Sequence, residues 1–140
     1  MKAKTTDHKI IEQLELDKFI IYILDDKIIK IVTKEHTEIE VEDILKLQEA
    51  KYKLIGDKKH CVLFIPPRSG VMSKEARETA SGEIANKNAL AKAVVFKNLG
   101  MRIFINFFIR VNKPIVEHKI FENENDALEW LYTMYDLKVK

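Results

Sequence analysis

Apolar residues follow two successive periods along this chain, first that of strands and then that of helices. Residues 19–24 and 28–32 are β-branched or aromatic runs, and Asp25 to Lys27 separate them. This pattern predicts an antiparallel hairpin with a tight turn. Residues 10–16 fit a preceding strand only in part, because their apolar positions alternate incompletely.

The middle of the chain changes to a helical period and then to a buried strand. Gly56 offers a C-terminal stop to the first predicted helix. Residues 60–65 are almost wholly apolar, which is typical of a strand covered on both faces, and Pro66 and Pro67 end it. The positions that share the apolar face of the predicted helix are Val41, Ile44, Leu45, Gln48, Tyr52 and Ile55.

The second half alternates helix and strand. Ser73 is placed to cap a helix over residues 73–80, residues 83–88 are helix or turn, and residues 91–96 are the next strand. A long apolar helix follows and stops before Pro114. After an edge strand within residues 115–121, Asn123 can cap a final helix with Asp126 three residues on. The buried face of that helix is predicted to be Ala127, Leu128, Leu131, Met134 and Tyr135, with Trp130 at its margin.

This order of elements predicts one α/β domain over residues 1–140, with its core at about residues 10–135. An N-terminal hairpin followed by alternating β and α elements indicates a central mixed sheet flanked by helices. A chain of 140 residues is long enough to bury a full core without disulfides or metals. No repeat or linker divides it.

Charge and composition exclude several classes of function. The 24 basic and 22 acidic residues are interspersed and give a net charge of +2, so no basic field is present to hold nucleic acid. No apolar stretch approaches the ~20 residues that span a bilayer, and the N-terminus lacks a secretory signal. The lone Cys61 fits a reducing compartment. We therefore expect a cytoplasmic protein without a membrane span.

The helix at residues 98–111 has an apolar surface broader than one neighbour would cover. Its apolar members are Leu99, Ile103, Phe104, Phe107, Phe108 and Val111. Leaving three phenylalanines in water is unfavourable, since each contributes roughly 1.5 to 3 kcal/mol on burial. The excess implies a second partner, either another copy of the chain or an apolar ligand. We favour a homodimer, with Phe104, Phe107 and Phe108 at the interface.

The same helix carries a polar stripe of Arg102, Asn106 and Arg110 at four-residue spacing. Two guanidinium groups on one stripe can grip a carboxylate or phosphate, and the start of the Ser73 helix could add backbone donors. Lys113 could join this surface. The alternative is that the stripe is the solvent-exposed side of a packed helix. The candidate binding residues of the chain are Ser73, Arg77, Arg102, Asn106, Arg110 and Lys113.

Other chemistry finds no support in the sequence, so we expect no catalytic residues, no metal and no cofactor. The four histidines lack metal-ligand spacing, and the four glycines form neither a P-loop nor a dinucleotide fingerprint. Cys61 sits inside a buried strand, where a thiol is inert. Asp25 and Asp26 are explained by the turn. The lysines at 51, 53, 58 and 59 are interpreted as a solvated cluster near the end of the first helix.

Three segments carry a family resemblance: Met72 to Arg77, Asn106 to Pro114 and Ile120 to Leu131. Together with the order of elements, they resemble the small SpoIIAA-like proteins of bacteria. That group is similar to the STAS domain and is also described as STAS/SEC14-like. The resemblance implies a sheet flanked by helices, no catalytic centre, and action through binding. In the anti-sigma antagonists a regulatory serine lies in an Asp-Ser-Ser-Gly type sequence; here Ser73 is near that place, and Lys74 stands roughly where the phosphorylated serine would be.

Two functional hypotheses follow. The first is a non-enzymatic regulatory or scaffold module that acts through protein–protein interaction, as a homodimer or with another protein. The alternative is a binder or carrier of a small amphipathic or acidic ligand, lipid-like or nucleotide, held between the helix at residues 98–111 and the sheet. An enzyme of unrecognised type is the third reading.

Overall fold

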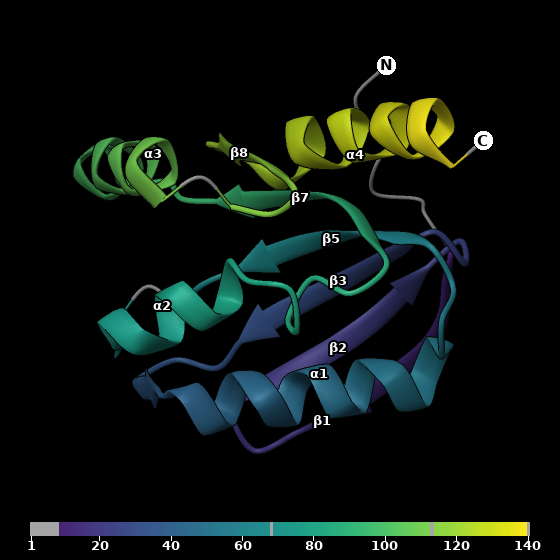
Figure 1. Ribbon diagram of the computed structural model, residues 1–140, viewed down its shortest axis with the longest axis horizontal. Helices are drawn as coiled ribbons and strands as arrows, with labels where there is room; N and C mark the ends of the chain where they lie inside the picture. Colours follow the sequence, from purple (N-terminus) through teal and green to yellow (C-terminus); the bar gives the residue numbers. More distant parts are fainter. Residues whose placement is uncertain (1–8, 68, 113, 140) are drawn as a thin grey trace.

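A computed structural model describes residues 9–67, 69–112 and 114–139 of the chain. Its centre is a six-stranded mixed sheet with the order β1-β2-β3-β5-β7-β8 (Figure 1). The first three strands are antiparallel, and β3, β5, β7 and β8 run parallel. The strands are β1 (Ile10–Glu15), β2 (Phe19–Leu24), β3 (Ile28–Thr33), β5 (His60–Ile65), β7 (Ala89–Val95) and β8 (Glu117–Phe121). The expected mixed α/β sheet with an N-terminal hairpin is confirmed.

Helices cover both faces of this sheet. The helices are α1 (Val41–Ile55), α2 (Lys74–Ala80), α3 (Leu99–Asn112) and α4 (Glu124–Lys138). In Figure 1, α4 lies above the sheet and α1 below it, while α2 and α3 lie at the end toward which β5 and β7 point. Ligands of open α/β sheets bind at this carboxyl end of the parallel strands. None of the helices in the described part of the chain is both long and apolar enough to cross a membrane.

The two faces of the sheet have separate cores because successive strand residues point to opposite sides. On β5, Val62 and Phe64 pack toward α1 and α2, whereas Cys61 and Leu63 pack toward α4. The four residues Cys61 to Phe64 therefore show no polar alternation in sequence, as expected for a strand covered on both sides. The α4 core holds Leu128 and Leu131, which the sequence placed on the buried face of the last helix.

Local signals in the sequence specify the turns and the helix starts. Asp25 and Asp26 have positive φ angles of 51° and 60°, which a type I′ hairpin turn requires. The side chain of Ser73 accepts a hydrogen bond from the backbone amide of Ala76 at 3.0 Å, and Asn123 accepts one from Asp126 at 2.8 Å. Both expected N-caps are confirmed.

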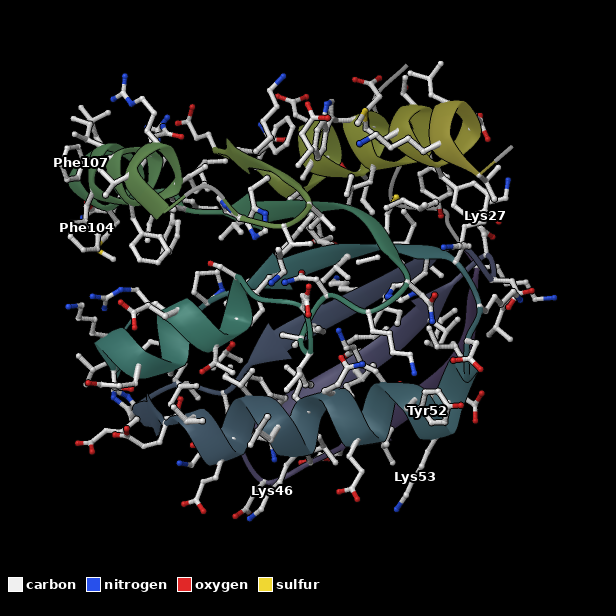
Figure 2. The ribbon with its side chains drawn as sticks, viewed as in Figure 1. Lys27, Lys46, Tyr52, Lys53, Phe104 and Phe107 are labelled. Carbon is white, nitrogen blue, oxygen red and sulfur yellow. The ribbon has the colours of Figure 1, made fainter. Side chains whose placement is uncertain are left out.

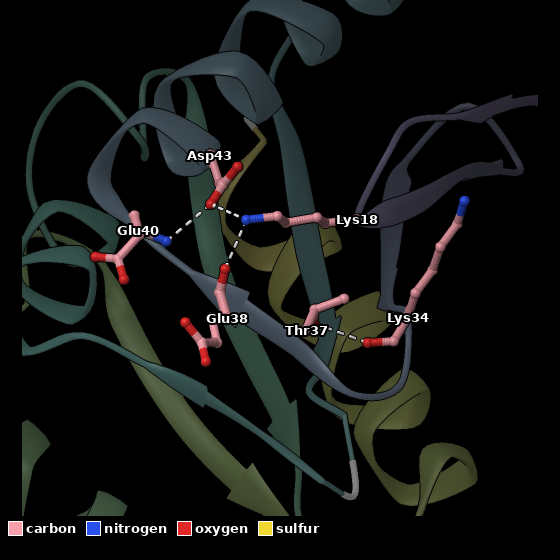
Figure 3. Close-up of polar contacts among 6 residues, drawn as sticks. All are labelled: Lys18, Lys34, Thr37, Glu38, Glu40 and Asp43. Carbon is pink, nitrogen blue, oxygen red and sulfur yellow. Dashed lines mark hydrogen bonds and ion pairs between the residues drawn. The ribbon is translucent and has the colours of Figure 1, made fainter.

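A small polar network fixes where α1 begins (Figure 3). The carboxylate of Asp43 accepts hydrogen bonds from the backbone amide of Glu40 at 2.9 Å and from Lys18 Nζ at 2.8 Å. Lys18 Nζ also donates to the backbone carbonyl of Glu38 at 2.6 Å. Because Lys18 lies in the turn between β1 and β2, the network ties the start of α1 to the antiparallel half of the sheet.

Two expectations need correction. The buried face of α1 consists of Ile44, Leu47, Ala50 and Lys51, whereas Leu45 and Tyr52 are exposed. The predicted face shares Ile44 with the observed one, but it included Leu45 and Tyr52 and left out Leu47, Ala50 and Lys51. Residues 37–39 and 70–72, which were not expected to be strands, form the parallel pair β4 and β6. Residues 83–88, expected to be helix or turn, are turns.

Candidate functional site

A cavity of about 240 Å³ lies between the sheet and three of the helices. Its floor is the face of β3, β5 and β7 that carries Ile31, Val62 and Val94. The walls come from α1, α2, α3 and the segment at residues 66–72. Figure 2 shows Phe104 on the side of α3 that faces α2. Val71, Met101 and Phe104 line the cavity and are also exposed, so they mark its mouth.

One polar residue of β7 faces this cavity because of the strand period. Ala91 and Ala93 pack toward α4, which directs Lys92 between them to the opposite side. The ladder pairs Lys92 with Val62 on β5 and with His118 on β8, and all three residues line the cavity. Lys92 Nζ donates to the carbonyl oxygen of Ala80 at 3.2 Å. A lysine therefore occupies a position that the sheet would normally fill with an apolar side chain.

A second lysine enters the cavity from α1. Lys51 is only 5% exposed and follows Ile44 and Leu47 on the face of α1 that packs toward the sheet. Its Nζ donates one hydrogen bond, to the carbonyl oxygen of Ala85 at 3.0 Å. An ammonium group has three protons to donate, so this single carbonyl leaves it under-satisfied. Among the described residues, no carboxylate forms an ion pair with Lys51 or Lys92.

Burial changes the protonation of these groups. Desolvation, with a smaller effect from the charge of Lys92, lowers the pKa of Lys51 to about 7. Desolvation lowers the pKa of Lys92 to about 8. His118 has a pKa lowered to about 4, by burial first and then by the charge of Lys92, so its imidazole is neutral at pH 7. Its Nδ1 lies 2.9 Å from the carbonyl oxygen of Val116, which the neutral tautomer with a proton on Nδ1 satisfies.

Arg77 completes the set of cations. Its guanidinium stands over the rings of Phe104 and Phe108, 5.4 Å and 5.6 Å from their centroids. Nη1 donates to the carbonyl oxygen of Met72 at 2.9 Å, while Nε is buried and has no partner among the described residues. Gln48 Oε1, also in the cavity wall, is likewise buried without a partner. A polar group of a ligand bound in the cavity would give such atoms a hydrogen-bond partner.

The cavity therefore has a mainly apolar lining that carries positive charge. Three basic side chains line it, at positions 51, 77 and 92, and the lining residues include no aspartate or glutamate. An uncompensated buried cation is costly to a fold, so such groups are expected to find an anion. A small acidic molecule with an apolar body matches both properties. The volume is slightly below the roughly 300–1,000 Å³ of common small-molecule sites, which favours a small ligand.

The structure separates the residues that the sequence singled out. Arg77, Phe104 and Phe108 line the cavity. Ser73 caps α2 outside it, and Phe107 points away from the molecule (Figure 2). The polar stripe also lies outside the cavity: Asn106 and Arg110 are exposed, and Arg102 is half-buried with Nε lacking a partner among the described residues. Lys113 lies outside the described residues.

The outer face of α3 remains uncovered in the single chain. Its four apolar side chains are 59 to 62% exposed: Leu99, Ile103, Phe107 and Val111. The inner side, with Ile105, Phe108 and Ile109, faces the cavity. The helix therefore divides its apolar surface between a cavity and the outside. The sequence predicted that one chain alone cannot cover the whole apolar surface of this helix, and the exposed outer face confirms this for the single chain.

Sequence reasoning missed the lysines, and one prediction about them was wrong. Lys51 was interpreted as part of a solvated cluster with three neighbouring lysines, but it is buried in the cavity wall. The usable signal was positional. Lys51 stands four residues after Leu47 on an otherwise apolar helix face, and Lys92 is the one charge inside the apolar run Ala91 to Val95. A charge at a core position without a nearby acidic residue indicates a site.

Neither a reactive thiol nor a metal cluster is present in the part of the chain that the structure describes. Cys61 is fully buried, and desolvation raises the pKa of its thiol to about 11. Its Sγ lies 3.6 Å from the carbonyl oxygen of Leu131. No three His, Cys, Asp or Glu side chains of residues 9–67, 69–112 and 114–139 come together as metal ligands would.

Comparisons with known proteins identify the fold. A family model described as "Domain of unknown function (DUF7793)" matches residues 22–135, more than half of the chain. A crystal structure of an uncharacterised DUF3478-family protein from Shewanella loihica PV-4, which has a SpoIIAA-like fold, is similar with a TM-score of 0.55 and 16% identity. The match covers 89% of this chain and 94% of the other. No protein with a curated description matches. The SpoIIAA-like fold expected from the sequence is confirmed.

Proposed function

This chain belongs to the DUF7793 family, a domain of unknown function, and we propose that it binds a small acidic ligand with an apolar body in the cavity beneath α3. The observation that carries the proposal is the pair Lys51 and Lys92, a buried and a half-buried lysine that each donate to one backbone carbonyl. This is the ligand-binding hypothesis of the sequence, which placed the ligand between this helix and the sheet. The residues proposed to hold its acidic group are now Lys51, Lys92 and Arg77 in place of the polar stripe of α3.

The ligand would meet complementary surfaces on all sides. Its acidic group would accept hydrogen bonds from Lys51, Lys92 or Arg77, which keep unsatisfied donors. Its apolar part would lie against Val62 and Phe108. A hydrogen bond between a charged donor and acceptor contributes roughly 1.5–3 kcal/mol, so each lysine should account for about a 10- to 100-fold change in affinity.

Calorimetric titration with octanoate and octyl phosphate tests this proposal. We expect one of these anions to bind to a single site, and octanol, which has the same chain without the charge, to bind at least about tenfold more weakly. Lys92→Met should reduce the affinity for that anion about 10- to 100-fold. Lys53→Met, which changes an exposed lysine of α1 (Figure 2), should leave it unchanged. Saturable binding of neither anion, or equal affinity in the Lys92 variant, would refute the proposal.

The outer face of α3 supports a second function, in regulation or assembly through protein contact. A second copy of this chain fits that face, because an apolar surface is self-complementary and most small assemblies use isologous contacts. In this role Phe107 and Ile103 would meet their symmetry mates. The two functions are compatible, since the cavity uses the other side of the helix.

Light scattering tests self-association directly. The parent protein should have twice the monomer mass, and Phe107→Asp should be monomeric. Leu137→Asp is the matched control, because Leu137 is a similarly exposed apolar residue on α4, away from α3. A parent protein that stays monomeric at high concentration would exclude the homodimer.

A further inference from the structure

Lys51 has the surroundings of an amine that reacts as well as binds. It lies in the wall of an apolar cavity, 5% exposed, with its Nζ on a single backbone carbonyl. The groups that face the cavity with it are Lys92 and Arg77, both basic, and His118, which is neutral. No described carboxylate is paired with Lys51 to hold its proton in place.

Two features activate lysine amines in proteins, and both occur here. The first is desolvation in a hydrophobic pocket, and the second is a neighbouring cation. Together they bring the pKa of Lys51 to about 7, so about half of these side chains carry a free lone pair at neutral pH. An ordinary lysine is almost completely protonated at that pH and is a poor nucleophile.

We propose that Lys51 forms a reversible imine with a ligand that carries an aldehyde or ketone group as well as an acidic group. This inference rests on the proposed function, because the acidic group is what brings the carbonyl into the cavity. The ligand class is therefore narrowed to small oxo acids with an apolar chain. Lys92 and Arg77 bind the acidic group, and the amine of Lys51 attacks the carbonyl carbon.

The step balances without any further reactant. The lone pair of Lys51 Nζ attacks the carbonyl carbon, and a proton shift from nitrogen to oxygen gives a neutral carbinolamine. The ammonium of Lys92 then protonates the hydroxyl group, which leaves as water while the nitrogen lone pair forms the C=N bond. The positive charge passes from Lys92 to the iminium on Lys51, so the net charge of the cavity is unchanged. Hydrolysis by the reverse path releases the ligand.

Reductive trapping tests this proposal. The protein is incubated at pH 7 with 2-oxooctanoate and sodium cyanoborohydride, which reduces an iminium to a stable secondary amine, and the modified peptide is identified by mass spectrometry. We expect one adduct, on Lys51, formed on the order of 1,000-fold faster than on surface lysines because of the larger fraction of free amine. Lys51→Met should abolish it, and Lys53→Met should not. Excess octanoate should compete.

The pH dependence separates activation from simple accessibility. The trapping rate of the parent protein should rise to half of its maximum near pH 7, the pKa of Lys51, and should fall again above about pH 8, where Lys92 loses the proton that it donates. In Lys92→Met this midpoint should move to higher pH, because a neighbouring positive charge is removed. A variant that only disturbed packing would lower the maximal trapping rate and leave the pH of its half-maximal value unchanged.

Failure of this inference is distinguishable from failure of the proposed function. If octanoate binds but 2-oxooctanoate leaves no adduct on Lys51, acid binding stands and the imine is refuted. If octanal, which has no acidic group, is trapped on Lys51 while octanoate does not bind, the reactive amine stands and acid binding is refuted. Labelling spread equally over surface lysines would overturn the assignment to Lys51.

Discussion

Replacing Lys51 by methionine should make the unliganded protein more stable at neutral pH. Methionine keeps an unbranched chain of similar length and removes the charge, so the space in the α1 wall stays filled. What disappears is the cost of holding an amine where its charged form is poorly solvated. Replacing buried charges by apolar side chains of similar volume is often neutral or stabilising by 1–4 kcal/mol.

The magnitude follows from the pKa of Lys51 and its one hydrogen bond. Lowering the pKa from 10.5 to about 7 corresponds to about 4 kcal/mol of lost stability at pH 7, at roughly 1.4 kcal/mol per pKa unit. Against this gain, the variant leaves the carbonyl of Ala85 without its donor, which costs roughly 1–3 kcal/mol. The net expectation is a stabilisation of about 1–3 kcal/mol.

The pH dependence gives the same prediction a second form. Between the folded pKa of about 7 and the unfolded value of 10.5, the unfolded chain binds more protons at Lys51 than the folded one. Stability therefore rises with pH through this window, and for Lys51 the rise from pH 7 to pH 9 is about 2 kcal/mol. Lys92, with a folded pKa of about 8, adds to the rise. Cys61 affects this dependence only at higher pH, because its raised pKa lowers the stability of the fold only above 9.0, the pKa of its thiol in the unfolded chain.

Urea denaturation of the parent protein and of Lys51→Met at pH 7 and pH 9 measures both effects. The parent should gain stability over this interval, and the variant should start higher and gain about 2 kcal/mol less. Lys53→Met, on the exposed side of the same helix, should follow the parent. A parent whose stability does not change with pH, or a variant less stable than the parent at pH 7, would refute the reasoning about a buried uncompensated lysine.

Three further outcomes follow from the structure, all measured by urea denaturation. The pKa values of His60 and His118 are lowered to about 4, mainly by burial. Because these imidazoles take up protons in the unfolded chain at a higher pH than in the folded one, the stability of the fold should fall by about 2 kcal/mol for each of them from pH 7 to pH 5. His118→Gln should remove half of the combined loss. Gly70→Ala should cost roughly 1–3 kcal/mol, because φ is +138° there and a Cβ atom would collide with the carbonyl of Thr37 on β4. Gly82→Ala, where a Cβ atom would make only ordinary van der Waals contacts, is the control, and equal effects of the two changes would contradict the argument. Asn123→Ala should cost about 1 kcal/mol by removing the cap of α4, an expectation that an unchanged denaturation midpoint would exclude.

Most of the fold could be predicted because its determinants are local. Two aspartates specify a hairpin turn, Ser73 and Asn123 begin helices, and a run of apolar residues identifies a buried strand. β4 and β6 could not be predicted in this way. Each has three residues, and what holds them is pairing between positions more than thirty residues apart, which leaves no period to read.

The candidate site could be predicted only in part, for a reason that lies in tertiary structure. Phe104, Phe108 and Arg77 stand out by type and position, but whether they face a cavity depends on how α2 and α3 approach each other. The lysines were harder, because a lysine on a helix is normally solvated. These two side chains point inward through tertiary contacts. Lys92 donates to the carbonyl oxygen of Ala80 at the end of α2, and Lys51 donates to that of Ala85 in the turn that follows.

The shallow packing of α3 has a consequence for motion. None of the described side chains of α3 is fully buried, whereas Ala127 and Leu131 of α4 lie in the core with no exposed surface. Segments with few buried apolar contacts open at low free energy while the rest of the fold persists. The amide protons of α3 should therefore exchange with solvent long before those of α4. Because the same helix walls the cavity, traffic into the interior can proceed at the rate of this local opening, without unfolding the sheet.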